Sequence, residues 1–241
     1  MDQVRVSAVS YLNTLPFQYG LFKGNKLPFM DVSLDIPSVC ADKLLNGEAS
    51  VGLIPVAVLP SLPEHSIVTD FCIAADGPVR TVLLYSDVPV EEIETIFLDY
   101  QSRTSVNLCR ILCKEHWNID PTFESTDTGF EGTFSGTSAG VVIGDRTFSM
   151  KRTYQYVYDL SEVWKEMTRL PFVFAAWVAH ATVPYPFIRA FNEILHFGID
   201  HLDEALHDYL NTHDDPGNLR GYLTESIKYR WDVQKQKGLQ L

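Results

Sequence analysis

The segment at residues 4–17, VRVSAVSYLNTLPF, places a β-rich run directly before a short polar loop and the start of a helix. The run at 4–9 predicts a strand, and Pro16 suits the first turn of the helix that follows. Polar side chains and free backbone N–H groups of the loop then lie at the carboxyl end of a strand, where open α/β sheets bind ligands. This segment constrains the fold because later segments repeat the arrangement with different polar loops.

The first part of the chain alternates predicted strands with predicted helices. Strands at 32–36 and 51–54 flank a helix. Pro37 opens that helix with Ser38 as its N-cap, and Pro55 suits the first turn of the next helix. Such alternation is typical of a parallel sheet.

The alternation is interrupted in the middle of the chain. Two β runs, at 67–75 and 79–85, follow one another without an intervening helix, and alternation resumes after Pro89. The apolar periodicity of the remaining chain predicts further helices over 102–117, 185–210 and 219–236.

This pattern predicts an α/β protein of two lobes. Residues 1–88 and 173–241 form the first, discontinuous lobe, and residues 89–172 form the second. Two strand crossovers, near residues 86–90 and 173–178, make a hinge. The cleft between the lobes becomes the ligand site.

Composition narrows the class of partner. The 241 residues allow two lobes of about 100 residues each. A formal net charge of −12 argues against nucleic acid and anionic membrane surfaces as partners, and no apolar run is long enough to span a bilayer. No secretory signal is visible at the N-terminus, so we expect a cytoplasmic protein whose four cysteines are buried free thiols.

The segment QSRTSV at residues 101–106 lies where a predicted strand meets a helix. Ser102, Thr104 and Ser105 bring three hydroxyls to the helix N-terminus, and Arg103 adds a positive charge. Hydroxyls, free N–H groups and an arginine together suit a carboxylate or a phosphate. The alternative is ordinary N-capping by Ser102 or Thr104, with Arg103 in solvent.

Other polar candidates lie at strand ends or within β runs. Ser10 and Asn13 are candidate ligand contacts, and the alternative for Asn13 is that it caps the following helix. Asp145 is a structural cap, a hydrogen-bond acceptor for a substrate or an acid–base group, and Thr81 is a weaker candidate inside a β run. The sequence contains no metal-ligand motif, carboxylate pair or phosphate-binding glycine loop. The residues alone therefore predict a two-lobed protein that binds a small, oxygenated anion.

Six segments, in order along the chain, resemble the menaquinone-biosynthesis family of the futalosine pathway, in its chorismate dehydratase branch. They are VSYLNTLPF (9–17), GLIPVA (52–57), DGPVRTVLLYS (76–86), SRTSVNL (102–108), VIGD (142–145) and LPFVFAAW (170–177). The resemblance implies a type II periplasmic-binding-protein fold, which agrees with two lobes and a double crossover. Thr81 stands where serine is usual in this family, and Arg169 where a small residue is expected.

The resemblance implies a hydro-lyase that dehydrates chorismate to 3-[(1-carboxyvinyl)oxy]benzoate without metal or cofactor. Asn13 and Ser10 would be catalytic and orient the ether and its carboxylate. The implied substrate-binding residues are Arg103, Thr104, Ser105, Ser102, Thr81, Ile54 and Asp145. Two alternatives stay open. One is a non-catalytic small-anion binding protein on the same fold, and the other is the sister enzyme acting on de-hypoxanthine futalosine, for which we expect a histidine base.

Overall fold

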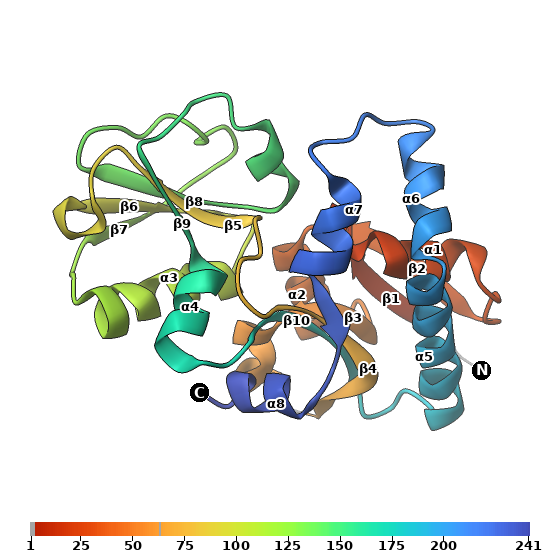
Figure 1. The fold of residues 1–241 in the computed structure, drawn as a ribbon. Helices are drawn as coiled ribbons and strands as arrows, with labels where there is room; N and C mark the ends of the chain where they lie inside the picture. Colours follow the sequence, from red (N-terminus) through yellow and green to blue (C-terminus); the bar gives the residue numbers. More distant parts are fainter. Residues whose placement is uncertain (1–2, 63) are drawn as a thin grey trace.

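Two β-sheets, each flanked by helices, divide the protein into two lobes (Figure 1). The computed structural model describes residues 3–62 and 64–241. In lobe one the strand order is β11-β4-β10-β3-β1-β2, and in lobe two it is β7-β6-β8-β5-β9. Both sheets are mixed. In lobe one β1 runs parallel to β2 and β3, whereas β10 runs antiparallel to β3 and β4. In lobe two β6 runs parallel to β7 and β8, whereas β5 runs antiparallel to β8 and β9.

The six strands of lobe one come from two separate parts of the chain. They are β1 (Val4–Val9), β2 (Met30–Asp35), β3 (Val51–Pro55), β4 (His65–Ala75), β10 (Phe172–His180) and β11 (Lys228–Arg230). Its helices are α1 (Leu15–Lys23), α2 (Pro37–Leu45), α5 (Tyr185–Asp200), α6 (Leu202–Leu210), α7 (Leu219–Gly221) and α8 (Val233–Leu239). Phe17 of α1 meets the rings of Phe71 and Trp177 edge to face and joins the helices to the sheet.

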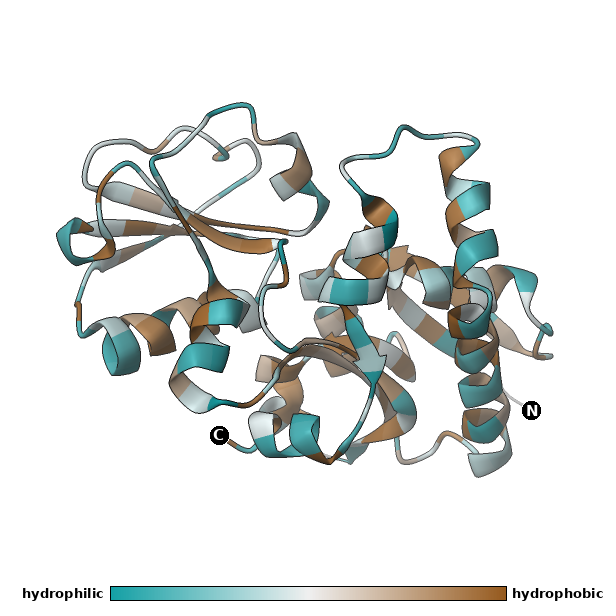
Figure 2. Cartoon of the chain, in the orientation of Figure 1, coloured by the Kyte–Doolittle hydropathy of each residue, from teal (hydrophilic) through white to brown (hydrophobic). Residues whose placement is uncertain are grey.

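Lobe two is one continuous stretch of chain. Its strands are β5 (Val82–Ser86), β6 (Thr95–Leu98), β7 (Thr122–Ser125), β8 (Ser138–Ile143) and β9 (Tyr156–Asp159), and its helices are α3 (Thr104–Leu112) and α4 (Leu160–Thr168). Residues of the inner strands are hydrophobic, as the brown segments of both sheets in Figure 2 show, whereas the helices carry hydrophilic outer faces. None of the helices in the described ranges is long and apolar enough to cross a bilayer.

The two crossovers are short and lie earlier than the sequence predicts. Strand β5 pairs with β8 and β9, so it belongs to lobe two and not to a first lobe ending at residue 88. The first crossover is therefore the segment 76–81, where Gly77 (φ 115°) and Arg80 (φ 67°) have backbone conformations that no strand adopts. The predicted strand at 79–85 accordingly begins only at Val82. The second crossover precedes β10, after Arg169 (φ 64°) ends α4.

Several predicted helices are shorter or divided. The helix over 185–210 breaks at His201 into α5 and α6. The segment 219–236 is not a single helix. It contains strand β11, because Lys228–Arg230 pairs with the otherwise open edge of β4. The helix over 102–117 begins at Thr104 and ends in a π-helical turn, Cys113–Trp117.

Two predicted helix starts in lobe one are also corrected. Ser38 lies inside the first turn of α2, whose N-cap is Ile36 without a side-chain bond. Pro55 ends strand β3, and a 3₁₀ helix over Val56–Ser61 follows. The edge strands β7 and β9 are only four residues long and are not apparent in the sequence pattern. The four cysteines are buried and free, as expected.

Candidate functional site

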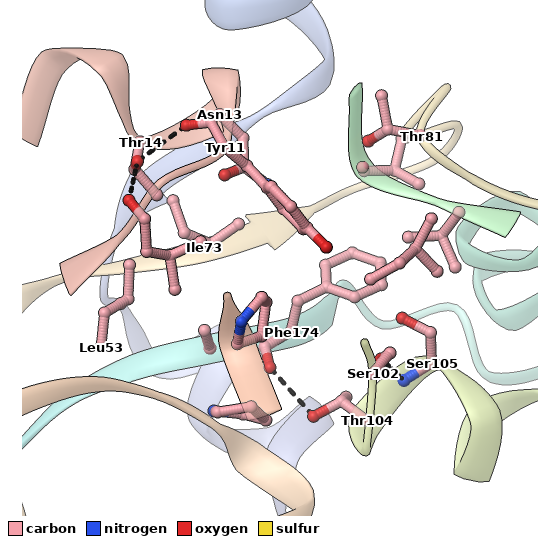
Figure 3. A pocket seen from close by; sticks show the side chains of 18 residues that line it. Tyr11, Asn13, Thr14, Leu53, Ile73, Thr81, Ser102, Thr104, Ser105 and Phe174 are labelled. Carbon is pink, nitrogen blue, oxygen red and sulfur yellow. Dashed lines mark hydrogen bonds between the residues drawn. The ribbon is translucent and has the colours of Figure 1, made fainter. Parts of the chain in front are cut away.

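A pocket lies between the lobes, and both lobes supply its walls (Figure 3). Its cavity volume is about 60 Å³, and a cavity needs about 10–15 Å³ by the same measure to hold one water molecule. The cleft is therefore narrow, and the lobes are close together. The lining residues of lobe one are Val9, Tyr11, Asn13, Thr14, Pro37, Leu53, Pro55, Ile73, Phe174 and Ala175. From the first crossover and lobe two come Val79, Thr81, Val82, Ser102, Thr104, Ser105, Ile143 and Gly144.

The polar loop after β1 forms one wall of the pocket. Thr14 fixes its conformation, because the Thr14 hydroxyl lies 2.6 Å from the carbonyl oxygen of Val9 and 2.8 Å from that of Tyr11. The Asn13 carbonyl accepts a 3.0 Å hydrogen bond from the Tyr229 hydroxyl, which holds the backbone. The buried Asn13 Oδ1 has no hydrogen-bond partner among the described residues. An unpaired buried acceptor costs about 1–3 kcal/mol, so a ligand donor at this position would relieve that cost.

The N-terminus of α3 forms the opposite wall. Ser102 Oγ accepts a 2.9 Å hydrogen bond from the Ser105 N–H, so Ser102 caps the helix in the way the capping alternative predicts. Thr104 Oγ1 donates to the Phe174 carbonyl at 3.1 Å and accepts from the Ala57 N–H at 3.3 Å, which ties α3 to lobe one. The Ser105 hydroxyl lines the pocket at 3% residue exposure and makes no side-chain hydrogen bond within the described ranges.

Thr81 also lines the pocket and bridges the lobes. Its hydroxyl lies 2.8 Å from that of Tyr222, a residue of lobe one. Burial raises the pKa of Tyr222, so the Tyr222 hydroxyl stays neutral and retains its proton for hydrogen bonding. Thr81 is therefore committed to a structural contact in this arrangement, although one side of it faces the pocket.

Arg103 does not reach the pocket, contrary to the sequence prediction. Its guanidinium forms an ion pair with Asp42 on the outside of α2, with 40% of the Arg103 side chain exposed. The N-terminal turn of α3 directs residues 102, 104 and 105 inward, which leaves position 103 on the outer side of the turn. No lysine, arginine or histidine is among the residues that line the pocket in the described part of the chain.

Three further predicted site residues lie outside the pocket lining. Ser10 is exposed, and its N–H donates to the Asp35 carbonyl. Ile54 is fully buried in β3 and belongs to the core. The Asp145 carboxylate is used between the lobes, where it accepts the N–H of Leu12 at 3.1 and 3.0 Å. Burial raises the pKa of Asp145 to about 6.

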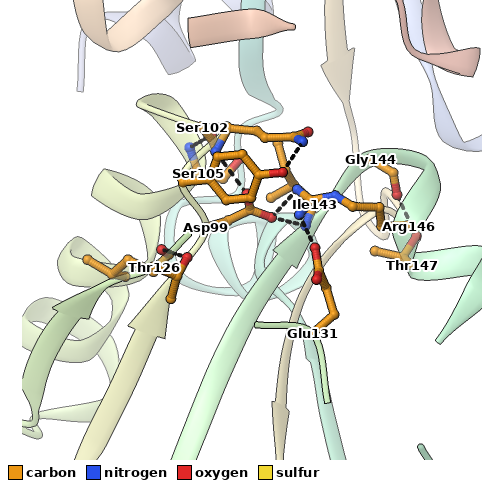
Figure 4. Close-up of polar contacts among 12 residues, drawn as sticks. Asp99, Ser102, Ser105, Thr126, Glu131, Ile143, Gly144, Arg146 and Thr147 are labelled. Atoms are coloured by element: carbon orange, nitrogen blue, oxygen red, sulfur yellow. Dashed lines mark hydrogen bonds and ion pairs between the residues drawn. The ribbon is translucent and has the colours of Figure 1, made fainter. Parts of the chain in front are cut away.

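A buried charge network behind the pocket was not apparent in the sequence (Figure 4). Arg146 pairs with Asp99 and Glu131 at once. The Asp99 side chain is fully buried and also accepts the N–H groups of Gln101 and Ile143, each at 2.9 Å. Burial raises the pKa of Asp99, against the opposing effect of Arg146. The network fixes the loop before Ser102 and the end of β8, two parts of the pocket wall.

Comparisons with solved structures identify the fold. Protein AF1704 from Archaeoglobus fulgidus superposes with a TM-score of 0.75 at 15% identity, over 99% of this chain and 94% of that one. The periplasmic aliphatic sulphonate binding protein SsuA from Escherichia coli gives a TM-score of 0.60 at 13% identity, over 100% and 90% of the two chains. With two lobes, two sheets and a pocket between them, the protein has the periplasmic-binding-protein-like fold.

Comparisons of sequence identify the family. Residues 4–241 match a family model described as menaquinone biosynthesis. The chain is also 27% identical to the chorismate dehydratase of Thermus thermophilus over 215 residues, which cover 81% of this chain and 77% of the relative. The chain therefore belongs to the menaquinone biosynthesis family.

Proposed function

We propose that this protein is a chorismate dehydratase, a hydro-lyase that converts chorismate into 3-[(1-carboxyvinyl)oxy]benzoate and water at the first step of the futalosine route to menaquinone. The family and the dehydratase relative support the proposal. The observation that carries it in the structure is the pocket itself, in which Asn13 of lobe one faces the N-terminus of α3 in lobe two.

The reaction breaks two bonds of the substrate ring. The C3 proton leaves, the electron pair of that bond enters the ring, and the hydroxyl at C4 departs and takes up a proton to form water. The ring becomes aromatic, which drives the step. The protein's task is then to hold the substrate in a reactive geometry and to exclude water.

Asn13 and the hydroxyls at α3 are the groups we assign to substrate binding. Asn13 would orient the enolpyruvyl ether and its carboxylate by donating from its amide Nδ2–H groups, while its free Oδ1 would accept from the substrate hydroxyl. The enolpyruvyl carboxylate in turn takes the C3 proton when held in the right rotamer. The hydroxyls of Ser102 and Ser105, together with N–H groups of the first turn of α3, would meet the ring carboxylate. Thr104 also lines the pocket, but its hydroxyl proton is already donated to the Phe174 carbonyl. The serine and N–H contacts replace the predicted arginine contact, because Arg103 is paired with Asp42 on the outer surface.

We also propose that the reaction requires neither a metal nor a cofactor and that the enzyme is cytoplasmic. The test incubates the purified protein with chorismate and no additions, and follows the rise of ultraviolet absorbance from an aromatic product. Turnover that survives a chelator is the expected result. Activity that vanishes with the chelator and returns with a divalent ion would refute the cofactor-free mechanism.

A non-catalytic anion-binding protein is the second candidate, since the sulphonate-binding SsuA shares the fold. Calorimetry distinguishes the two: tight binding of an anion together with complete inertness toward chorismate would favour the binding protein. The sister enzyme acting on de-hypoxanthine futalosine is less well supported, because no histidine is among the pocket-lining residues described.

A further inference from the structure

Two short 3₁₀ segments from opposite lobes meet at the pocket. Segment η1 (Leu12–Thr14) follows the first strand of lobe one, and η5 (Gly144–Ser149) follows β8 of lobe two. The Leu12 N–H lies 3.1 and 3.0 Å from the two oxygens of Asp145. This N–H is an otherwise free donor at the start of η1, so the carboxylate of one lobe caps the helix of the other.

Tyr11 and Gly144, the residues immediately before Leu12 and Asp145, also contact each other. Gly144 has φ 65° and packs so closely on Tyr11 that a Cβ at position 144 would lie 2.7 Å from Tyr11 Cε2. The Tyr11 hydroxyl donates to Oε1 of Gln101, again across the lobes. A ring from lobe one thus rests on a glycine of lobe two, where no larger side chain fits.

The surroundings of Asp145 indicate that its carboxylate holds the two lobes together. Four titratable groups interact electrostatically with this carboxylate: Arg146, Tyr11, Tyr209 and Tyr222. Arg146 is engaged by Asp99 and Glu131. The Asp145 oxygens face the Leu12 N–H, and Asp145 is absent from the pocket lining.

We propose that Tyr11 and Leu12 of lobe one and Gly144 and Asp145 of lobe two form a latch that holds the cleft closed, with Asp145 as a positioning residue that does not touch the substrate. Its use in catalysis rests on the proposed function, but the latch itself consists only of protein atoms. It therefore contributes to closure whether or not a ligand fills the pocket.

The test measures the distance between the lobes directly. Spin labels are placed on cysteines introduced at the exposed positions Lys151 and Asp214, one on each lobe; the four native cysteines are buried and stay unlabelled. Pulsed electron resonance without ligand should show a closed population. Asp145→Ala should lower the ratio of closed to open protein by about tenfold or more, as expected for loss of a hydrogen bond to a charged group. Asp145→Asn keeps an acceptor for the Leu12 N–H and should restore the closed population.

Gly144→Ala tests the ring contact, with Gly136→Ala as its matched control. Gly136 has φ 63°, and a Cβ there would meet nothing within 4 Å, so both variants share the backbone strain but only one creates the clash with Tyr11. Gly144→Ala should lower the closed-to-open ratio by about tenfold relative to Gly136→Ala.

Two results would overturn the latch. One is a ligand-free wild type without any closed population. The other is an unchanged distance distribution in both Asp145→Ala and Gly144→Ala. Adding chorismate to the labelled wild type tests the proposed function separately: if chorismate neither shifts the distances nor is consumed, the proposed function fails while the ligand-free comparison of variants still decides the latch.

Discussion

Replacing Arg146 by alanine should destabilise the protein far more than replacing Arg220, although both arginines form ion pairs with an aspartate. Asp99, the partner of Arg146, has a fully buried side chain, whereas Arg220 and its partner Asp203 keep 63% and 65% of their side chains exposed. Removing one member of a buried pair costs about 3–5 kcal/mol, because the remaining charge is uncompensated. An exposed pair is worth about 0.2–1 kcal/mol.

These free energies convert into distinct melting temperatures. In a protein of this size 1 kcal/mol corresponds to about 2–4 °C, so Arg146→Ala should melt about 6–20 °C lower and Arg220→Ala at most about 4 °C lower. The two variants are compared by calorimetry and by urea unfolding in the same buffer. At pH 5 the Arg146→Ala loss should be smaller than at pH 8, since the orphaned Asp99 can be protonated without the arginine. Equal losses in the two variants, or a loss independent of pH, would refute the reasoning.

Three further predictions concern the site. Asn13→Ala should abolish most turnover with little change in melting temperature, because the loop is held by backbone bonds and by Thr14; a large drop in melting temperature would make Asn13 structural. Arg103→Ala should change chorismate affinity by less than about twofold by calorimetry, since its pair with Asp42 is half exposed; a tenfold loss would return Arg103 to the site. Burial raises the pKa of Asp145 to about 6, so ionising this carboxyl group costs more in the folded protein than in the unfolded chain. The free energy of unfolding should therefore fall as pH rises from about 4 to about 6. The corresponding curve of Asp145→Asn should lack this fall, and an unchanged curve would contradict the prediction.

The alternation of strands and helices was enough to predict two lobes and a cleft between them. The boundary at residue 88 was wrong because a β run that looks continuous over 79–85 is interrupted by the positive φ of Arg80, a conformation that composition does not reveal. Strand β11 was missed for a related reason: three residues pair with an open sheet edge, and their sequence carries no periodicity.

The site was predictable only where a side chain's direction follows from its element. Ser102, Thr104 and Ser105 were found because they start a helix at a strand end, and all three line the pocket. Arg103 has the right chemistry, but the turn of the helix faces it outward. Asp145 pairs with Leu12, which lies 133 positions away in the sequence, and Asp99 pairs with Arg146, which lies 47 positions away. Such pairings arise only from the packing of the lobes and the sheet.

The dehydration itself is tested most directly with chorismate that carries deuterium at C3. The account predicts that the purified protein converts it to 3-[(1-carboxyvinyl)oxy]benzoate from which the label is lost, so that mass spectrometry gives the same product mass as unlabelled chorismate. An aromatic product that retains the deuterium, or no aromatic product from a protein that binds chorismate, would contradict it.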